Sequence, residues 1–305
     1  MIKKKKKQNP EDQEKKKAFK DLLDKFGDEI IHVFDESYER SPIEVIPSGL
    51  LGLDWVLGRG GYPKGRIVVL YGPESAGKST VCNKLVASAQ RLGMTCAYVD
   101  IEYSVDAEYL ALCGVTLDSN FILAQPDYGE QAFDVVEALI GKVDVIIVDS
   151  VALLVPKAEA EGEVTDQFIG LQARLVAKEM RRITPMMKGT RTVLVFTNQV
   201  RDKIGQSFGF GPNETMPGGH ALKHAASVVL SLRRTKPIMN GSQQVGFMIR
   251  VRSTKNKVGN PFRVLEIPMI FGYGVDDRLD FINLAILASV IKKRGGLYYL
   301  GKKVM

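Results

Sequence analysis

Apolar residues along the chain fall into short runs that alternate with stretches of helical spacing. The apolar runs cover residues 66–71, 94–100, 121–124, 144–149 and 192–197. Between them, apolar positions recur every three to four residues, after residue 78, at 130–141 and at 170–187. Near-continuous apolar strands separated by helices are typical of a parallel sheet covered on both faces. The pattern therefore predicts an α/β fold with a mostly parallel central sheet.

Smaller additions are predicted on either side of this pattern. Residues 227–232 and 245–251 are apolar runs with no long helix between them, so we expect antiparallel strands at one edge of the sheet. Residues 41–65 are rich in Gly and Pro and predict turns around a short helix at 50–57.

The two ends of the chain stand apart from the central pattern. Residues 18–26 have one apolar stripe at helical spacing, so this short helix must pack on its own domain or on a neighbouring subunit. Residues 276–293 predict a helix pair. We therefore expect a basic tail and N-terminal helix at 1–40, a core at 41–275 and a reduced C-terminal α/β piece at 276–305.

The net charge of +7 comes from the two ends. Residues 1–20 carry +6 and residues 291–305 carry +5, which leaves −4 for the rest. A basic tail either attracts polyanions or only keeps the chain solvated, and the sequence leaves both roles open. The three cysteines lack CxxC spacing, no apolar run reaches eighteen residues, and no apolar segment follows the basic start. We therefore expect a cytoplasmic protein with reduced thiols, no zinc site and no membrane partner.

The strongest chemical signal is the segment GPESAGKS at 72–79, which matches GxxxxGK[ST] between a predicted strand and a predicted helix. Such a loop points successive backbone N–H groups at one anion beside a helix N-terminus. Lys78 would reach the β- and γ-phosphates of ATP, and the Ser79 hydroxyl would bind Mg²⁺. The predicted nucleotide-binding residues of this P-loop are Gly72, Pro73, Glu74, Ser75, Ala76, Gly77, Lys78, Ser79 and Thr80.

Three carboxylates follow strands that should end near this loop. Asp149 ends the buried run VDVIIVD, and an acid at the carboxyl end of a parallel strand lies in the crevice where ligands bind. It is the candidate Walker-B acid, which would hold Mg²⁺ through water. Asp100 and Glu102 end the strand after the P-loop helix, and either could orient or deprotonate the attacking water. Residue chemistry alone does not choose between them.

Five segments, taken in order, resemble the bacterial RecA family of recombinases. They are GPESAGKST, YVDIEYSVD, IIVDSVALLVPKAEAEGE, TNQVRDKIG and GGHALKHAASVVLSLRR. Many ATPases share the P-loop, whereas the later segments are much more specific. The resemblance implies a RecA-like P-loop NTPase core. It also implies a DNA-dependent ATPase that forms a filament on single-stranded DNA, pairs it with homologous double-stranded DNA and exchanges strands.

The resemblance assigns roles around the nucleotide. Glu102 takes the place of the glutamate that activates water. Gln199 matches the glutamine that senses the γ-phosphate, and the loop after it would switch between order and disorder. Asp106 and Tyr109 match the residues that contact adenine. Lys255 and Lys257 match the lysines that reach the ATP of a neighbouring subunit.

Residues 157–170 and 200–217 match the two DNA-binding loops of the family. The second is rich in Gly and Pro, and such a segment orders only on a ligand. Its basic groups would meet phosphates and an apolar wedge would separate bases. The matched DNA-binding positions are Ile169, Gly170, Arg174, Arg181, Arg201, Lys203, Phe208, Gly218, Gly219 and Lys223.

The sequence departs from the family at two places. His224 stands where the family usually has an aromatic residue that links adjacent subunits, which leaves the strength of ATP-to-filament coupling open. The sequence ends at Met305, where relatives continue into a helical domain and an acidic tail. We therefore expect less restrained DNA binding, and a short protein of the kind that phages encode or a truncated chain.

Two other functions share part of this pattern. A ring-forming motor would have the P-loop, Glu102 and Asp149, but it need not have the GGHALK and TKNK segments or an N-terminal helix suited to docking on a neighbour. A regulatory protein that holds ATP and barely hydrolyses it, acting as a coprotease or scaffold, would differ from a recombinase in turnover.

Overall fold

The protein forms two compact units, Met1–Pro42 and Ile43–Met305. The structure, a computed structural model, describes residues 10–27, 30–31, 42–163, 170–202, 214–215, 217–295, 297–301 and 303–304. In the first unit, helix α1 (Pro10–Phe26) includes the helix predicted at 18–26 and begins earlier. Its apolar residues Phe19, Leu22 and Phe26 are exposed.

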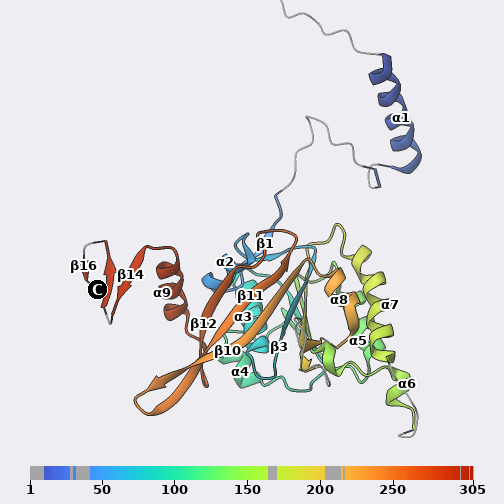
Figure 1. Ribbon diagram of the computed structural model, residues 1–305. Helices are drawn as coiled ribbons and strands as arrows, with labels where there is room; N and C mark the ends of the chain where they lie inside the picture. The colour runs from blue at the N-terminus through green and yellow to red at the C-terminus, as the bar shows by residue number, and fades with distance from the viewer. Residues whose placement is uncertain are drawn as a thin grey trace, which may run out of the picture. The chain divides into compact units, whose positions relative to one another are not determined.

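A nine-stranded sheet forms the centre of the second unit (Figure 1). Its strands are β3 (Arg66–Gly72), β4 (Cys96–Asp100), β5 (Phe121–Ala124), β6 (Val145–Asp149), β7 (Val193–Gln199), β10 (Val228–Asn240), β11 (Gln243–Asn256), β12 (Val264–Ile270) and β13 (Gly274–Val275). They lie in the order β13–β12–β11–β10–β3–β7–β6–β4–β5. From β10 to β5 the neighbours are parallel, whereas β11, β12 and β13 are antiparallel. The predicted α/β fold, with its antiparallel edge, is confirmed.

Helices cover both faces of this sheet and form two hydrophobic cores. The helices of one face are α2 (Leu51–Leu57), α3 (Lys78–Arg91) and α4 (Ala107–Leu112); those of the other are α5 (Gly129–Leu139), α7 (Leu171–Met186) and α8 (Gly219–Ala225). Figure 1 shows α5, α7 and α8 gathered beside the sheet. Successive residues of a strand point to opposite faces, so Leu70 joins the first core and Val69 the second.

The remaining elements of the core are short and lie in the connections. They are β1 (Val45–Ile46), β2 (Tyr62–Pro63), the 3₁₀ helix η1 (Val151–Leu153), α6 (Lys157–Ala160), β8 (Arg201–Asp202) and β9 (Glu214–Thr215). β1 pairs with β2, and β8 pairs with β9, both in antiparallel fashion.

The C-terminal segment differs from the expected helix pair at 276–293. One helix is present, α9 (Asp277–Leu287), and three short antiparallel strands follow it: β14 (Ile291–Arg294), β15 (Leu297–Leu300) and β16 (Lys303–Val304). The prediction of a second helix was wrong because Gly295, with a positive φ of 61°, turns the chain so that Ile291 pairs with Leu300. The division of the chain into three parts remains a prediction.

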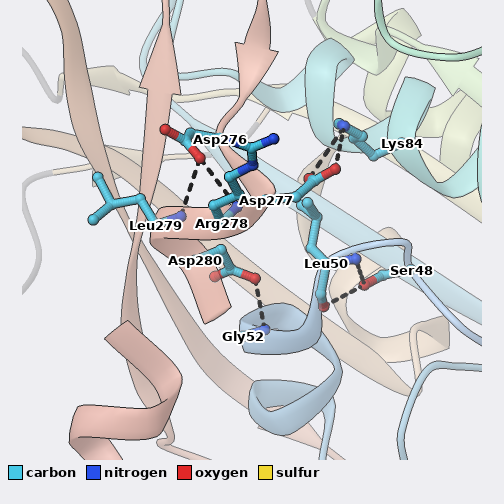
Figure 2. Close-up of polar contacts among 9 residues, drawn as sticks. All are labelled: Ser48, Leu50, Gly52, Lys84, Asp276, Asp277, Arg278, Leu279 and Asp280. Atoms are coloured by element: carbon cyan, nitrogen blue, oxygen red, sulfur yellow. Dashed lines mark hydrogen bonds and ion pairs between the residues drawn. The ribbon is translucent and has the colours of Figure 1, made fainter. Parts of the chain in front are cut away.

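Polar contacts hold α9 against the core (Figure 2). Asp276 caps the helix, and Asp277 forms an ion pair with Lys84 of α3 at 3.2 Å. The carboxylate of Asp280 is buried and accepts the backbone N–H of Gly52 at 2.9 Å. A side chain at Gly52 would overlap Asp280, so glycine is what permits α9 to approach α2 this closely.

Candidate functional site

The P-loop lies between β3 and α3, as the motif predicts. β3 ends at Gly72 and α3 begins at Lys78. Gly77 has a φ of 86°, and a Cβ atom there would also strike Ile249 of β11. A Cβ atom on Gly72 would overlap the carbonyl oxygen of Leu232 in β10. Both glycines are therefore required by the packing of neighbouring strands as well as by the turn.

The ends of four strands bring the predicted residues together. Gly72 pairs with Gln199, and Asp100 pairs with Asp149, so β3, β7, β6 and β4 end at one edge of the sheet. A pocket of about 370 Å³ opens there. Its predicted lining residues are Glu74, Ser75, Ala76, Gly77, Lys78, Ser79, Thr80, Glu102, Tyr109, Asp149 and Gln199.

Asp149 is buried, and three hydroxyl groups donate to its carboxylate. Ser79 Oγ and Tyr98 Oη each lie 2.7 Å from Oδ2, and Thr197 Oγ1 lies 2.5 Å from Oδ1. Burial, with the neighbouring charge of Asp149, raises the pKa of Tyr98 well above its ordinary value, so the phenol remains a donor. A carboxylate beside a serine hydroxyl offers the hard oxygen ligands that suit Mg²⁺.

The two acids after β4 have different surroundings. Asp100 is fully buried, and it accepts the backbone N–H groups of Ser104 and Val105 at 3.2 and 3.1 Å and the Gln125 amide at 3.1 Å. Its carboxylate therefore shapes the turn that follows the strand. Glu102 lines the pocket.

Two donors orient the Glu102 carboxylate. Ser150 Oγ and Gln199 Nε2 donate to the same oxygen, Oε1, at 2.5 and 3.2 Å. Ser150 directly follows Asp149, and Gln199 ends β7. The geometry therefore favours Glu102 over Asp100 as the acid that faces a reacting water.

The Lys78 ammonium folds back onto its own loop. Its Nζ donates to the carbonyl oxygens of Gly72 and Pro73 at 3.2 and 2.9 Å. Burial lowers the pKa of Lys78, and the charges of Asp149 and Glu102 oppose that shift. These two carboxylates therefore favour the charged form of Lys78 at the place where phosphates would lie.

The pocket is also lined by residues that the motifs did not reveal. They are Arg234 of β10, Phe247 of β11 and the segment Met269, Ile270, Phe271 and Gly272 at the end of β12. Tyr109 also lines the pocket, and its hydroxyl is 2.7 Å from Thr80 Oγ1. Asp106, predicted at the adenine, caps α4 by accepting the N–H groups of Glu108 and Tyr109.

Comparison with known proteins identifies the family. A family model described as the RecA N-terminal domain matches residues 13–276. The chain belongs to the RecA family. It is 45% identical to Protein RecA of Thermus thermophilus over 298 residues, which cover 95% of this chain and 86% of that protein. It is 46% identical to Protein RecA of Pseudomonas savastanoi pv. phaseolicola over 270 residues, 88% of this chain and 75% of that one. The resemblance carried by the five segments is confirmed.

The predicted DNA-binding positions of this RecA family chain gather on α7 and α8, which pack side by side. Gly170 and Gly218, both with positive φ, are the N-cap residues of the two helices, and Gly219 begins α8. Arg174 and Arg181 lie seven residues apart on α7, both exposed, so they share one face. Lys223 is exposed on α8, and Arg201 lies in β8. Ile169, Lys203 and Phe208 lie outside the described residues.

The two lysines matched to a neighbouring subunit's ATP lie near the end of β11. Lys255 Nζ donates to the carbonyl oxygens of Lys223 and His224 at 2.6 and 3.0 Å, at the C-terminus of α8. Burial lowers the pKa of Lys255, and the charges of Lys257 and Lys223 add to the shift. Lys257 is exposed.

The part of the chain that the structure describes contains no helix both long and apolar enough to cross a membrane.

Proposed function

We propose that the pocket at the strand ends binds ATP and hydrolyses it, and that the bound ATP sustains a filament on single-stranded DNA in the cytoplasm. As a member of the RecA family the chain is an ATP hydrolase of DNA recombination and repair. The observation that carries the proposal is the meeting of the P-loop, Asp149 and Glu102 in one pocket. The filament would pair its strand with double-stranded DNA and exchange strands.

Glu102 is the proposed general base. Its carboxylate would accept a proton from water while the water oxygen bonds to the γ-phosphorus and the bond to the bridging oxygen breaks. Ser150 and Gln199 hold one carboxylate oxygen, Oε1, and Oε2 is the oxygen that we assign to the water. Lys78 would leave the carbonyls of its loop to bind the phosphates, which stabilises the charge that builds up there.

Ser79 and Asp149 would hold the Mg²⁺ that accompanies the nucleotide, Asp149 through water. When bound, the ion would neutralise phosphate charge. Tyr98 and Thr197 fix the orientation of the Asp149 carboxylate, and they would remain as its donors if Ser79 bound the ion instead. Tyr109 and Asp106 would contact the adenine.

The exposed basic face of α7 and α8 is the proposed track for DNA. Arg174, Arg181 and Lys223 would contact phosphates, and the N-terminal glycines of both helices leave room for the backbone to approach. The loop after Gln199 would complete this surface with Arg201, Lys203 and Phe208, and the loop before Gly170 would add Ile169.

Assembly would place Lys255 and Lys257 against the nucleotide of the next subunit. There they would stabilise charge on the transferred phosphoryl group, as arginine fingers do. A head-to-tail contact of this kind is heterologous, so it produces a helical filament when the rotation does not close.

The test is ATP hydrolysis with and without single-stranded DNA, for the wild type and for Glu102→Gln. We expect strong stimulation by DNA in the wild type and a loss of at least about 100-fold in kcat in the variant, because the amide cannot accept the proton. Glu108→Gln, an exposed acid on α4, is the control and should retain the wild-type rate. Hydrolysis that ignores DNA, or a Glu102→Gln rate near the wild type, would contradict the proposal.

A further inference from the structure

An arginine from a distant strand holds the P-loop. β10 pairs with β3 as far as Ser231 and then continues beyond the end of β3, which carries Arg234 over the loop. Arg234 Nε donates to the backbone carbonyl oxygen of Ser75 at 2.6 Å. Ser75 lies in the middle of the loop and has a φ of 54°. Residues other than glycine rarely adopt this conformation, so contacts around the loop must stabilise it.

Aromatic rings fix the position of the Arg234 guanidinium. Its central carbon lies 4.4 Å from the centroid of the Phe247 ring, within the range of a cation–π contact. Phe247 in turn packs against Phe271, with the ring centroids 5.8 Å apart. All three side chains line the pocket. The guanidinium is therefore held by the Phe247 ring, while its Nε is bonded to the loop.

We propose that Arg234 is a positioning residue for nucleotide binding. By holding the Ser75 carbonyl, it keeps the neighbouring N–H groups of the loop directed toward the phosphates before the nucleotide arrives. A loop already in its bound conformation loses less conformational freedom on binding, so affinity rises. The positive charge beside the loop adds to the attraction for phosphate. This inference rests on the proposed ATP site and adds a residue that the P-loop motif does not contain.

The direct test is the affinity for a fluorescent ADP analogue with Mg²⁺ and without DNA. We expect Arg234→Ala to raise Kd about ten-fold, since one charge-assisted hydrogen bond and the preorganisation of the loop are both removed. Arg234→Lys keeps the charge but lacks the planar group that stacks on Phe247, so we expect an intermediate rise of about three-fold. Lys236→Ala is the matched control, because Lys236 is an exposed cation two residues further along β10.

The outcomes separate this inference from the proposed function. If the wild type binds the analogue and Arg234→Ala binds it equally well, the positioning role is wrong while the ATP site stands. If the wild type does not bind it, the ATP site itself is wrong. Thermal unfolding without nucleotide distinguishes a structural role. A fall in unfolding temperature with unchanged Kd, in either Arg234 variant, would overturn the inference, whereas a raised KM for ATP with little change in kcat would support it.

Discussion

At the scale of single residues, hydroxyl groups hold the two acids of the site. Asp149 is bonded to Ser79, Tyr98 and Thr197, and Glu102 is bonded to Ser150. Buried or half-buried carboxylates need such donors, because an unpaired one would lose its hydration without compensation. These hydroxyls therefore fix where the carboxylate oxygens point, which a general base requires.

Replacement of Ser150 by Ala should lower kcat for ATP hydrolysis by about ten-fold, because Glu102 would lose its shortest hydrogen bond and rotate away from the water. The Kd for ADP should change little, since Ser150 does not line the pocket. Steady-state kinetics and ADP binding on the same preparation measure the two effects.

Ser253→Ala is the matched control for this change. Ser253 is fully buried, and its hydroxyl has no partner among the residues that the structure describes. We expect the wild-type kcat in that variant. An unaltered kcat in Ser150→Ala would show that Gln199 alone is sufficient to orient Glu102.

The motifs predicted the P-loop and the acidic residues of the pocket, but they did not reveal its lining residues on β10, β11 and the end of β12. GPESAGKS and the strand-end acids are local patterns, so the sequence alone indicates them. Arg234 meets Ser75 across 159 positions of the chain, through the pairing of β10 with β3, and no spacing rule reveals such a contact. The same holds for the contact between Phe247 and Phe271, which lie 24 positions apart in the chain and belong to no motif.

At the scale of elements, the junction of α2 and α9 brings two acids into a poorly solvated place. Asp54 of α2 accepts the backbone N–H of Ser48 at 2.8 Å, and Asp280 accepts that of Gly52. Burial raises the pKa of Asp54 from 3.8 to about 6, and the charge of Asp280 adds to the shift. Burial also raises the pKa of Asp280, so α9 docks at a cost when both acids are ionised.

This junction predicts a pH dependence of stability. Between about pH 4 and pH 6 the unfolded chain loses the Asp54 proton while the folded chain keeps it, so the contribution of Asp54 to the free energy of unfolding falls as pH rises. Asp54→Asn keeps an acceptor for Ser48 and removes the titration. Between pH 4 and pH 6, the free energy of unfolding of the variant should therefore rise by on the order of 2 kcal/mol relative to that of the wild type.

Urea unfolding at several pH values measures this difference. Asp118→Asn is the control, because Asp118 is exposed and accepts a backbone N–H in a similar way, from Asn120 at 2.8 Å. A constant difference between Asp54→Asn and the wild type from pH 4 to pH 7 would show that folding does not shift the pKa of Asp54.

Element types were easier to predict than element lengths. The alternation of apolar runs and helical spacing predicted the parallel strands, because each is a buried run between turns. β10 and β11 are longer than the apolar runs at 227–232 and 245–251, since the two strands stay paired with each other beyond those runs, out to Asn240 and Gln243. The helix predicted after α9 was wrong for the same reason: Leu297–Leu300 supplies strand partners that local spacing does not show.

At the scale of the whole molecule, charge is divided between the ends and the core. The excess of positive charge lies in residues 1–20 and 291–305, while the pocket and the α7–α8 face belong to the part between them. DNA contacts made by the α7–α8 face would have a geometry fixed by the fold, whereas contacts made by the N-terminal lysines would add affinity without any fixed geometry. Salt dependence distinguishes these contributions, because each phosphate contact releases counterions.

Deletion of residues 1–9 removes the five lysines at 3–7 and leaves α1 intact. A plot of log Kobs against log salt has a negative slope. If these lysines bind single-stranded DNA, the deletion should make that slope less steep by about 0.7 for each phosphate that is no longer neutralised. Affinity should fall most at low salt, where such electrostatic attraction is strongest. Replacement of the same lysines by Gln is the matched control for chain length, and it should reproduce the deletion.

Binding isotherms between low and physiological salt measure the slope, and a slope equal to that of the wild type would mean that the tail only solvates the chain. In that case the electrostatic part of DNA binding would have to come from the rest of the chain, and Arg174, Arg181 and Lys223 on the basic face of α7 and α8 would be the next residues to vary.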